Sequence, residues 1–132
     1  MQNLFRANFL YPDVDRDTNI LMIGFADAEF NTKEYILLQK SLAPGEQDKE
    51  LGLDEIHIEY NDQIHSTYGG ILNVELNNDC IEIELDDHTA RQLQTGKSIC
   101  VSFDKKNETI LTLEKNLTIM FQDYKVIFKS KL

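Results

Sequence analysis

The chain has 132 residues, a length that suits one domain, and we expect a single domain over residues 1–132. Apolar residues make up 42% and charged residues 27% of the chain, which excludes a disordered protein. The net charge is −10, with 20 acids against 6 bases between Asp13 and Asp104, so this body lacks the clustered Lys and Arg of a nucleic-acid-binding surface. Such acidity favours association with a basic partner, or it only keeps the protein soluble.

The N-terminal quarter of the chain reads mainly as strands. Leu4–Tyr11 is an expected first strand, closed by Pro12–Asp13. Ile20–Ala26 is a continuous apolar run, which is typical of a strand buried on both faces. Tyr35–Leu42 is compatible with a strand or a short helix, and we expect the strand.

The next part of the chain alternates between polar segments and one short strand. Pro44–Gly45 predicts a turn that leads into a polar loop at residues 46–50. Glu55–Tyr60 alternates polar and apolar residues, as a half-buried strand does. Asn61–Gly70 is polar and ends in two glycines, which predicts a second long loop.

A hairpin and a short helix are predicted next. Ile71–Leu76 and Cys80–Leu85 flank three turn-forming residues, Asn77–Asp79, and this pattern predicts a β-hairpin. Either aspartate of Asp86–Asp87 is a good N-cap, so a short helix is expected near residues 87–95, ended by Gly96. Ser98–Phe103 alternates again and predicts a strand.

The C-terminal part predicts a second helix. Apolar residues recur every three or four positions, at 110, 113, 117, 120, 121 and 124, which is typical of a helix. Asp104 or Asn107 is the expected N-cap, and residues 126–128 extend or end the helix. The expected fold class is α+β and mostly β: a largely antiparallel sheet with a short helix near 87–95 and a C-terminal helix near 107–122.

The sequence has no sign of export or membrane insertion. The N-terminus lacks a cationic segment followed by a long apolar run, and no stretch approaches the roughly 20 apolar residues of a membrane helix. We therefore expect a cytoplasmic protein with no membrane partner. Strand parity places Cys80 and Cys100 opposite the core-facing residues, and Glu82 and Glu84 beside Cys80 disfavour a thiolate, so free thiols are expected rather than a redox pair.

We find no catalytic motif in the sequence. Glycine-rich phosphate loops, nucleophile elbows and zinc-protease motifs are all missing, so we expect neither catalytic residues nor a cofactor. The best metal candidate is the set His57, Glu59, Asp62 and His65, because two histidines and a carboxylate can hold zinc or iron. Its spacing matches no known signature, and solvated side chains are the commoner arrangement. A small metal-binding domain or enzyme using His57, Asp62 and His65 remains the alternative function.

The two polar segments around the strand at 55–60 are the candidate binding site. Long ordered loops usually contribute packing or binding, and acids, amides and tyrosine suit a polar protein interface. The expected partner-binding residues are Glu46, Gln47, Asp48, Glu59, Asp62, Gln63 and Tyr68, with Gly69 and Gly70 as a structural turn. The alternative is that the two glycines only form a bend, beside which Tyr68 packs locally.

Several segments in this region carry a family resemblance. Gly24–Asn31 reads GFADAEFN, Lys33–Gln39 reads KEYILLQ, Leu51–Asp54 reads LGLD, Glu59–Gln63 reads EYNDQ and Tyr68–Ile71 reads YGGI. With Glu46–Asp48, Ser66, the hairpin and the short helix after Leu85, they resemble the immunity protein 10 family of bacterial polymorphic toxin systems. The resemblance covers roughly residues 1–105, and residues 109–132 carry no such motif.

The resemblance implies a mostly-β immunity protein that binds and neutralises a cognate bacterial toxin. It further implies that the toxin is typically a nuclease of HNH/endonuclease VII-like fold. A basic nuclease surface would agree with the acidity of this chain, and inhibition would be stoichiometric, without direct contact to nucleic acid. An adaptor with an unrelated partner is a third possibility. The residues leave open whether the toxin's active site or an exosite is covered, and which oligomer forms.

Overall fold

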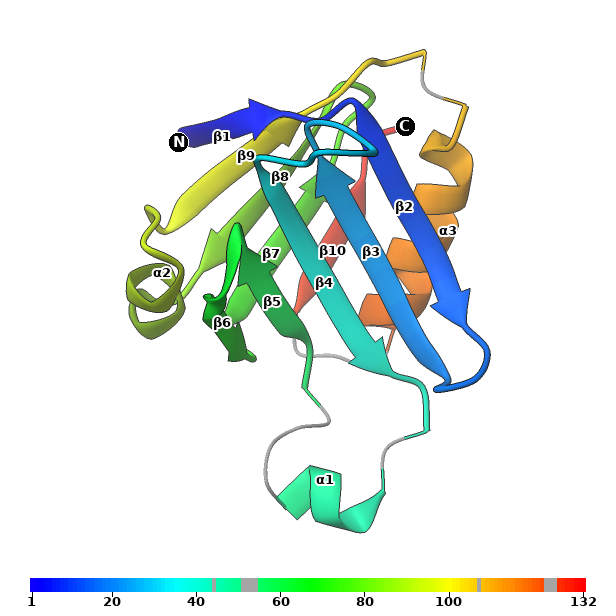
Figure 1. Cartoon of the computed structure of the whole chain (residues 1–132), viewed down its shortest axis with the longest axis vertical. Coiled ribbons are helices and arrows are strands. Elements are labelled where there is room, and N and C mark those ends of the chain that lie inside the picture. The colour runs from blue at the N-terminus through cyan, green and yellow to red at the C-terminus, as the bar shows by residue number, and fades with distance from the viewer. Residues whose placement is uncertain (44, 51–54, 107, 123–125) are drawn as a thin grey trace.

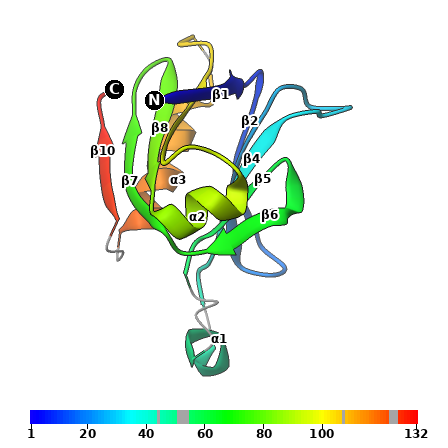
Figure 2. The same cartoon turned by 90° about the vertical axis from the view of Figure 1, so that its left-hand side faces the viewer.

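Two five-stranded β-sheets face one another, and two helices lie at their open sides (Figures 1 and 2). The computed structural model describes residues 1–132 except 44, 51–54, 107 and 123–125. The first sheet has the order β1-β9-β8-β7-β10, with the bounds β1 Gln2–Arg6, β9 Ser98–Ser102, β8 Cys80–Leu85, β7 Ile71–Leu76 and β10 Ile127–Ser130. The second sheet has the order β2-β3-β4-β5-β6, with the bounds β2 Phe9–Asp15, β3 Ile20–Ala26, β4 Tyr35–Ser41, β5 His57–Tyr60 and β6 Asp62–Tyr68.

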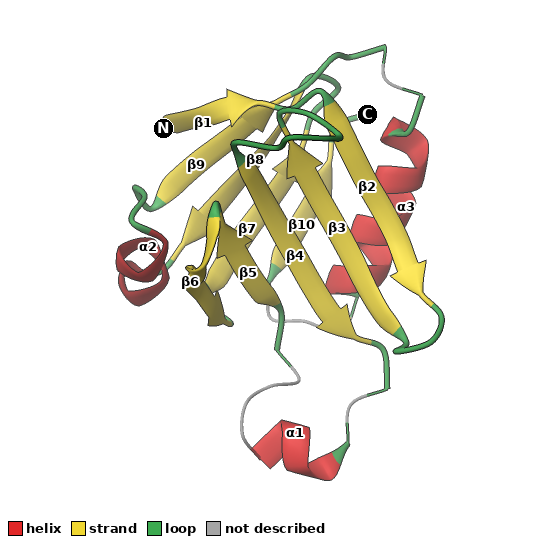
Figure 3. Cartoon of the chain, in the orientation of Figure 1, coloured by secondary structure: helices red, strands yellow, loops and turns green. Residues whose placement is uncertain are grey.

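The second sheet is antiparallel throughout, whereas the first is mixed. In the first sheet β1 runs parallel to β9, and β10 runs parallel to β7. The described helices are α1 (Glu46–Glu50), α2 (Asp87–Leu93) and α3 (Ile110–Phe121), shown in red in Figure 3. None of the helices in the described part of the chain is long and apolar enough to cross a membrane.

The core lies between the inner faces of the sheets. Alternate residues of each strand point inward, as the period of two requires, so that Leu21, Ile23 and Phe25 of β3 are fully buried. Phe25 stacks on Phe103, which follows β9, with 6.5 Å between the ring centroids. Helix α3 adds Leu113, Leu117, Met120 and Phe121 to this core, and α2 adds Ala90 and Leu93. The predicted mostly-β, α+β fold class is confirmed.

Most of the predicted elements are confirmed with small shifts at their ends. The strands β3, β4, β5 and β9, the β7–β8 hairpin, and the helices α2 and α3 all lie where the sequence patterns place them. Asp86 caps α2 by accepting a hydrogen bond from the Thr89 N–H, but the helix ends at Gln94 in the left-handed region rather than at Gly96. Thr109 precedes α3 without a side-chain cap, and Asn107 lies outside the described residues.

The expected single strand over Leu4–Tyr11 is wrong, because the chain changes sheets at Ala7 and Asn8. The Ala7 N–H donates to Ser102 O of the first sheet (2.7 Å), and the Asn8 N–H donates to Ala26 O of the second (2.9 Å). Pro12 lies within β2 rather than ending it. Proline has no N–H to donate to a neighbouring strand. Pro12 is tolerated because β2 is an edge strand, and no strand lies on its open side to accept such a hydrogen bond.

Three further expectations are corrected. Residues 46–50 form the helix α1 and not a loop. Asn61–Gly70 contains β6, which forms a hairpin with β5 across Asn61, a residue in the left-handed region at φ 62°. Residues 126–128 lead into β10 and do not extend the helix, because the chain there pairs with β7.

The chain passes from the second sheet to the first at Gly69 and Gly70. Their φ values are 78° and 86°, which L residues with a side chain rarely adopt. The Gly69 N–H donates to Ile56 O (2.8 Å), and the Asp86 N–H donates to Gly70 O (2.9 Å), so the crossover is fixed from both sheets. A Cβ on Gly70 would lie 1.7 Å from Thr89 Oγ1. The crossover therefore has no room for a side chain.

Gly70→Ala should lower the free energy of unfolding by about 2–4 kcal/mol, because the positive φ and the overlap with the buried Thr89 both oppose a side chain. Urea unfolding monitored by circular dichroism measures the change. Gly96→Ala is the matched control, since the nearest atom to a Cβ there is Oε1 of the exposed Gln2 side chain at 3.3 Å, and the other contacts, at 3.9 Å, are ordinary. Equal stability of the two variants would contradict this account of the crossover.

Candidate functional site

The seven expected partner-binding residues do not form one surface. Glu46, Gln47 and Asp48 belong to α1, which extends away from the sheets below β4 (Figure 1). Tyr68 pairs with His57 at the end of β6 that lies nearer α1, whereas Asp62 pairs with Tyr60 at the other end, beside Gln63. Glu59 lies between them on β5, so only Glu59 and Tyr68 share one face of the second sheet.

The alternative metal site is not assembled. His57 and Glu59 point to the outer face of the second sheet, as do their β6 partners Tyr68 and Ser66. His65 is the neighbour of Ser66 and therefore points to the opposite face. Within the described residues no three His, Cys, Asp or Glu side chains are grouped as metal ligands would be. The two-histidine site with Asp62 is therefore wrong as a geometric proposal.

The outer face of the second sheet carries several aromatic and aliphatic side chains. Strand alternation and register place both large and polar residues on it: Phe9, Tyr11, Asp13 and Asp15 of β2, Ile20, Met22 and Ala26 of β3, Tyr35, Leu37, Gln39 and Ser41 of β4, and His57 and Glu59 of β5 with Ser66 and Tyr68 of β6. Tyr11 and Tyr68 remain 43% and 45% exposed. Figure 1 looks onto this face, and no described helix crosses it. The expectation that β3 is buried on both faces is therefore wrong, since its second face is only half-buried.

The outer face of the first sheet differs in character. Its outward positions are mainly small or polar side chains: Asn73 and Glu75 of β7, Cys80, Glu82 and Glu84 of β8, and Ser98, Cys100 and Ser102 of β9. Ile127 of β10, the partner of Asn73, is an exposed apolar exception. The aromatic side chains Phe9, Tyr11, Tyr35 and Tyr68, in contrast, lie on the outer face of the second sheet.

A hollow of about 240 Å³ lies in the middle of the outer face of the second sheet. Gly24 forms its floor, because its cross-strand neighbours are Tyr11 and Leu37 and it has no side chain of its own. Phe9 and Tyr35 line the sides, and the β3–β4 loop (residues 27–34) forms the rim. The lining is mainly apolar, which is the character of a recognition pocket for an apolar side chain.

Hydrogen bonds hold the β3–β4 loop in shape. Asp27 Oδ1 accepts the N–H groups of Lys33 (3.0 Å) and Glu34 (3.2 Å), and the Asp27 N–H donates to Glu34 O (3.0 Å). The Thr32 hydroxyl donates to Ala28 O (2.7 Å). Burial alone would raise the pKa of Asp27, but these backbone N–H groups outweigh it and lower the pKa.

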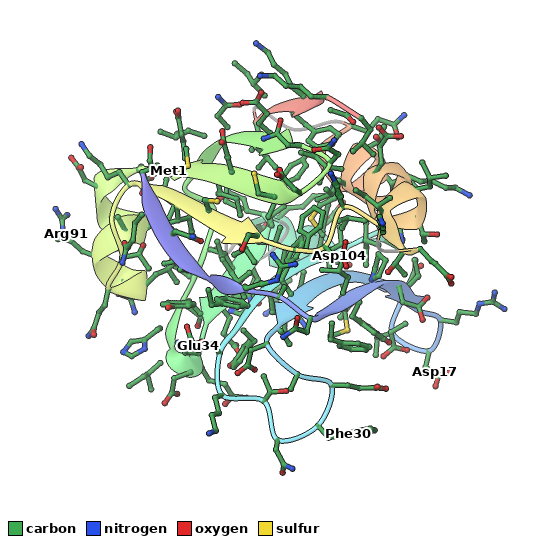
Figure 4. The ribbon with its side chains drawn as sticks, turned by 90° about the horizontal axis from the view of Figure 1, so that it is seen from above. Met1, Asp17, Phe30, Glu34, Arg91 and Asp104 are labelled. Atoms are coloured by element: carbon green, nitrogen blue, oxygen red, sulfur yellow. The ribbon has the colours of Figure 1, made fainter. Side chains whose placement is uncertain are left out.

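The ordered loop presents an aromatic side chain to solvent. Phe30 at its tip is 77% exposed and points away from the molecule (Figure 4). Figure 2 shows the loop extending outward from the second sheet, on the side away from the first. Single exposed apolar residues are common on protein surfaces, but an exposed aromatic side chain on a fixed loop beside an apolar hollow is a candidate contact residue. The sequence prediction missed Phe30, although a Phe between Glu29 and Asn31 was the available signal.

His57 and Tyr68 form a second, more polar feature on the same face. Their ring centroids lie 4.9 Å apart, and they line a pocket of about 370 Å³ together with Gln39, Ser41 and Glu55. His57 Nδ1 is buried and has no hydrogen-bond partner among the described residues. Burial lowers the pKa of His57, and the nearby Glu59 carboxylate opposes the shift only in part. His57 is therefore neutral at pH 7.

Glu59 is held in place by a tyrosine. The Tyr35 hydroxyl donates a 2.5 Å hydrogen bond to Glu59 Oε2. Burial, and then this carboxylate, raise the pKa of Tyr35, so the hydroxyl stays protonated and remains a donor. Glu59 thus presents its negative charge on the outer face in a fixed orientation.

Comparison with known proteins identifies the family. A family model described as immunity protein 10 matches residues 6–111. The chain belongs to the immunity protein 10 family. The family implies an immunity protein of a toxin system, whose partner is a cognate toxin protein. A search of curated proteins found no match. The matched segment contains all five strands of the second sheet and the β3–β4 loop.

The thiols of this immunity protein stand apart from the hollow. Cys80 and Cys100 are free and half-buried on the outer face of the first sheet, where Cys100 pairs with Glu82 and Cys80 with Ser102. Burial raises the pKa of Cys100 to about 11, and Cys80 and Glu82 add to the shift. A thiol with so high a pKa is a poor nucleophile at neutral pH.

Gly24→Val should raise the free energy of unfolding by about 0.5–1 kcal/mol, because a strand glycine is replaced by a β-branched residue. The added Cβ would meet Leu37 Cδ1 at 3.6 Å and Tyr11 Cβ at 3.8 Å, which are ordinary contacts. Urea unfolding measures the change. A loss of stability would mean that the hollow is a packing requirement rather than an open recess.

His57 should make the protein less stable in acid. Its pKa in the folded state lies below the unfolded value of 6.5, so the unfolded state binds the proton more readily and stability falls as pH drops below about 6.5. His57→Phe removes this titration and keeps the ring contact with Tyr68. The stability of wild type relative to this variant should therefore decrease between about pH 7.5 and pH 5.5 in urea titrations. A difference that stays constant over this range would contradict the assignment.

Proposed function

We propose that this immunity protein neutralises a nuclease toxin of HNH/endonuclease VII-like fold by stoichiometric binding, as one domain over residues 1–132 and without catalysing a reaction. The observation that carries the proposal is membership of the immunity protein 10 family over residues 6–111. The net charge of −10 supports a basic partner. A nuclease surface is basic where it binds the phosphate backbone, and opposite charge accelerates association.

Inhibition in this proposal requires no cofactor. The acidic side chains compete with nucleic acid for the basic surface of the toxin, so the complex excludes the substrate from that surface. Of the residues expected from the sequence, Glu59 and Tyr68 lie on one exposed face and are the first candidates for contact. Glu46, Gln47 and Asp48 on α1, and Asp62 and Gln63 at the start of β6, are candidates for the periphery of the interface.

Co-expression with the toxin encoded beside this chain tests the proposal. Cells that produce both proteins should survive, and the two should co-purify as a 1:1 complex. In vitro, plasmid cleavage by the purified toxin should stop at one equivalent of the immunity protein. The association rate should fall as salt is added, because charge steering is screened.

The control for the charge effect is an unrelated protein of similar size and similar negative charge. It should give no protection, because acidity alone does not create a complementary surface. Death of the co-expressing cells, or cleavage that continues in excess immunity protein, would overturn the proposed function. Protection by the acidic control would reduce the mechanism to non-specific electrostatics.

A further inference from the structure

The outer face of the second sheet has the composition of a protein-binding surface and no partner within the described chain. Its centre is the apolar hollow above Gly24, and Phe30 stands beside the hollow on a hydrogen-bonded loop. Aromatic anchors next to a preformed apolar pocket are the usual energetic centre of protein interfaces. The first sheet also has a hollow, of about 480 Å³, but charged and polar side chains such as Glu84, Lys97 and Ser98 line much of it, so that face serves as an internal comparison.

The edge of this face is acidic. Asp13 and Asp15 alternate with the apolar positions of β2, Glu29 lies at the rim of the hollow, and Glu59 lies on β5. Neither of the ion pairs that join described residues, Lys97 with Asp87 and Lys131 with Glu75, involves these acids. Their charges therefore remain available to an external partner. This acidic edge would complement a partner surface on which Lys and Arg side chains surround an apolar contact.

The charge distribution argues against a second copy of the chain as the occupant. A symmetric dimer through this face would bring the same acidic edge against itself, in a protein of net charge −10. We propose that the occupant is the toxin: one of its apolar side chains enters the hollow between Tyr11, Tyr35 and Leu37, Phe30 on the adjoining loop contacts the toxin beside it, and the toxin's Lys and Arg side chains face Asp13, Asp15, Glu29 and Glu59. This inference rests on the proposed function and assigns its binding surface.

Affinity for the purified toxin domain tests the assignment. Phe30→Ala removes the exposed anchor, and Gly24→Val fills the hollow from its floor. Each should weaken binding by at least about tenfold in isothermal titration calorimetry, which is the usual effect of altering an interface anchor. For Gly24→Val this weakening is expected in a protein that is no less stable than wild type. Lost affinity with retained stability distinguishes a blocked surface from a damaged fold.

Matched variants on other surfaces control the experiment. Leu111→Ala on α3 removes an apolar side chain that is 70% exposed, close to the exposure of Phe30, and should bind like wild type. Glu29→Lys should slow association at low salt, whereas Glu84→Lys, an exposed acid on the first sheet, should change it less.

The possible results separate the two claims. If wild type binds the toxin and both Phe30→Ala and Gly24→Val bind equally well, the surface assignment is overturned and the proposed function stands. If wild type does not bind, both are overturned. Light scattering of the free protein adds a third arm: a dimer that Phe30→Ala dissociates would assign this face to self-association and overturn the toxin assignment.

Discussion

The stacking of Phe25 on Phe103 joins the two sheets, and the exposed surface follows from it. Phe25, Ile23 and Leu21 must all point inward to meet the first sheet, so the register of β3 is fixed to the residue. The alternate residues then face outward, with Gly24 at the centre. A shift by one position would bury Gly24 and expose Phe25. The hollow on the outer face is thus determined by the same contact that closes the core.

The crossovers between sheets give this arrangement its rigidity. The chain changes sheets at Ala7–Asn8 and again at Gly69–Gly70, and backbone hydrogen bonds to both sheets fix each crossing. Helices α2 and α3 then fill the open sides of the sandwich with their buried residues. With both edges of the core closed, the outer faces are what the molecule presents, and the hollow on the second sheet has the more apolar lining of the two. Binding is therefore assigned to a preformed surface rather than to loops that order on contact.

Local patterns in the sequence predicted the parts of the fold that depend on local chemistry. Alternation located β5 and the β7–β8 hairpin, and an aspartate cap located α2. The patterns failed where pairing decides the structure: β6 is polar and is a strand because β5 lies beside it in a hairpin, and β10 pairs with β7, about fifty residues earlier in the chain. The site was predicted on polar loops, and the structure divides those residues among separate places. The apolar run Ile20–Ala26 held the missed signal, because a strand that is apolar on both sides has either two buried faces or one face reserved for a partner.

The acidic charge and the apolar outer face have complementary roles in one function. In the proposed complex, charge would bring a basic toxin to the surface quickly, and the hollow with Phe30 would determine how long it stays. Hydrogen exchange of the immunity protein with and without the toxin domain tests this account most directly. The account predicts that the toxin slows exchange in residues 28–33 of the β3–β4 loop and leaves the β7–β8 turn at Asn77–Asp79 unchanged. Protection of that turn, with the β3–β4 loop exchanging as in the free protein, would contradict it.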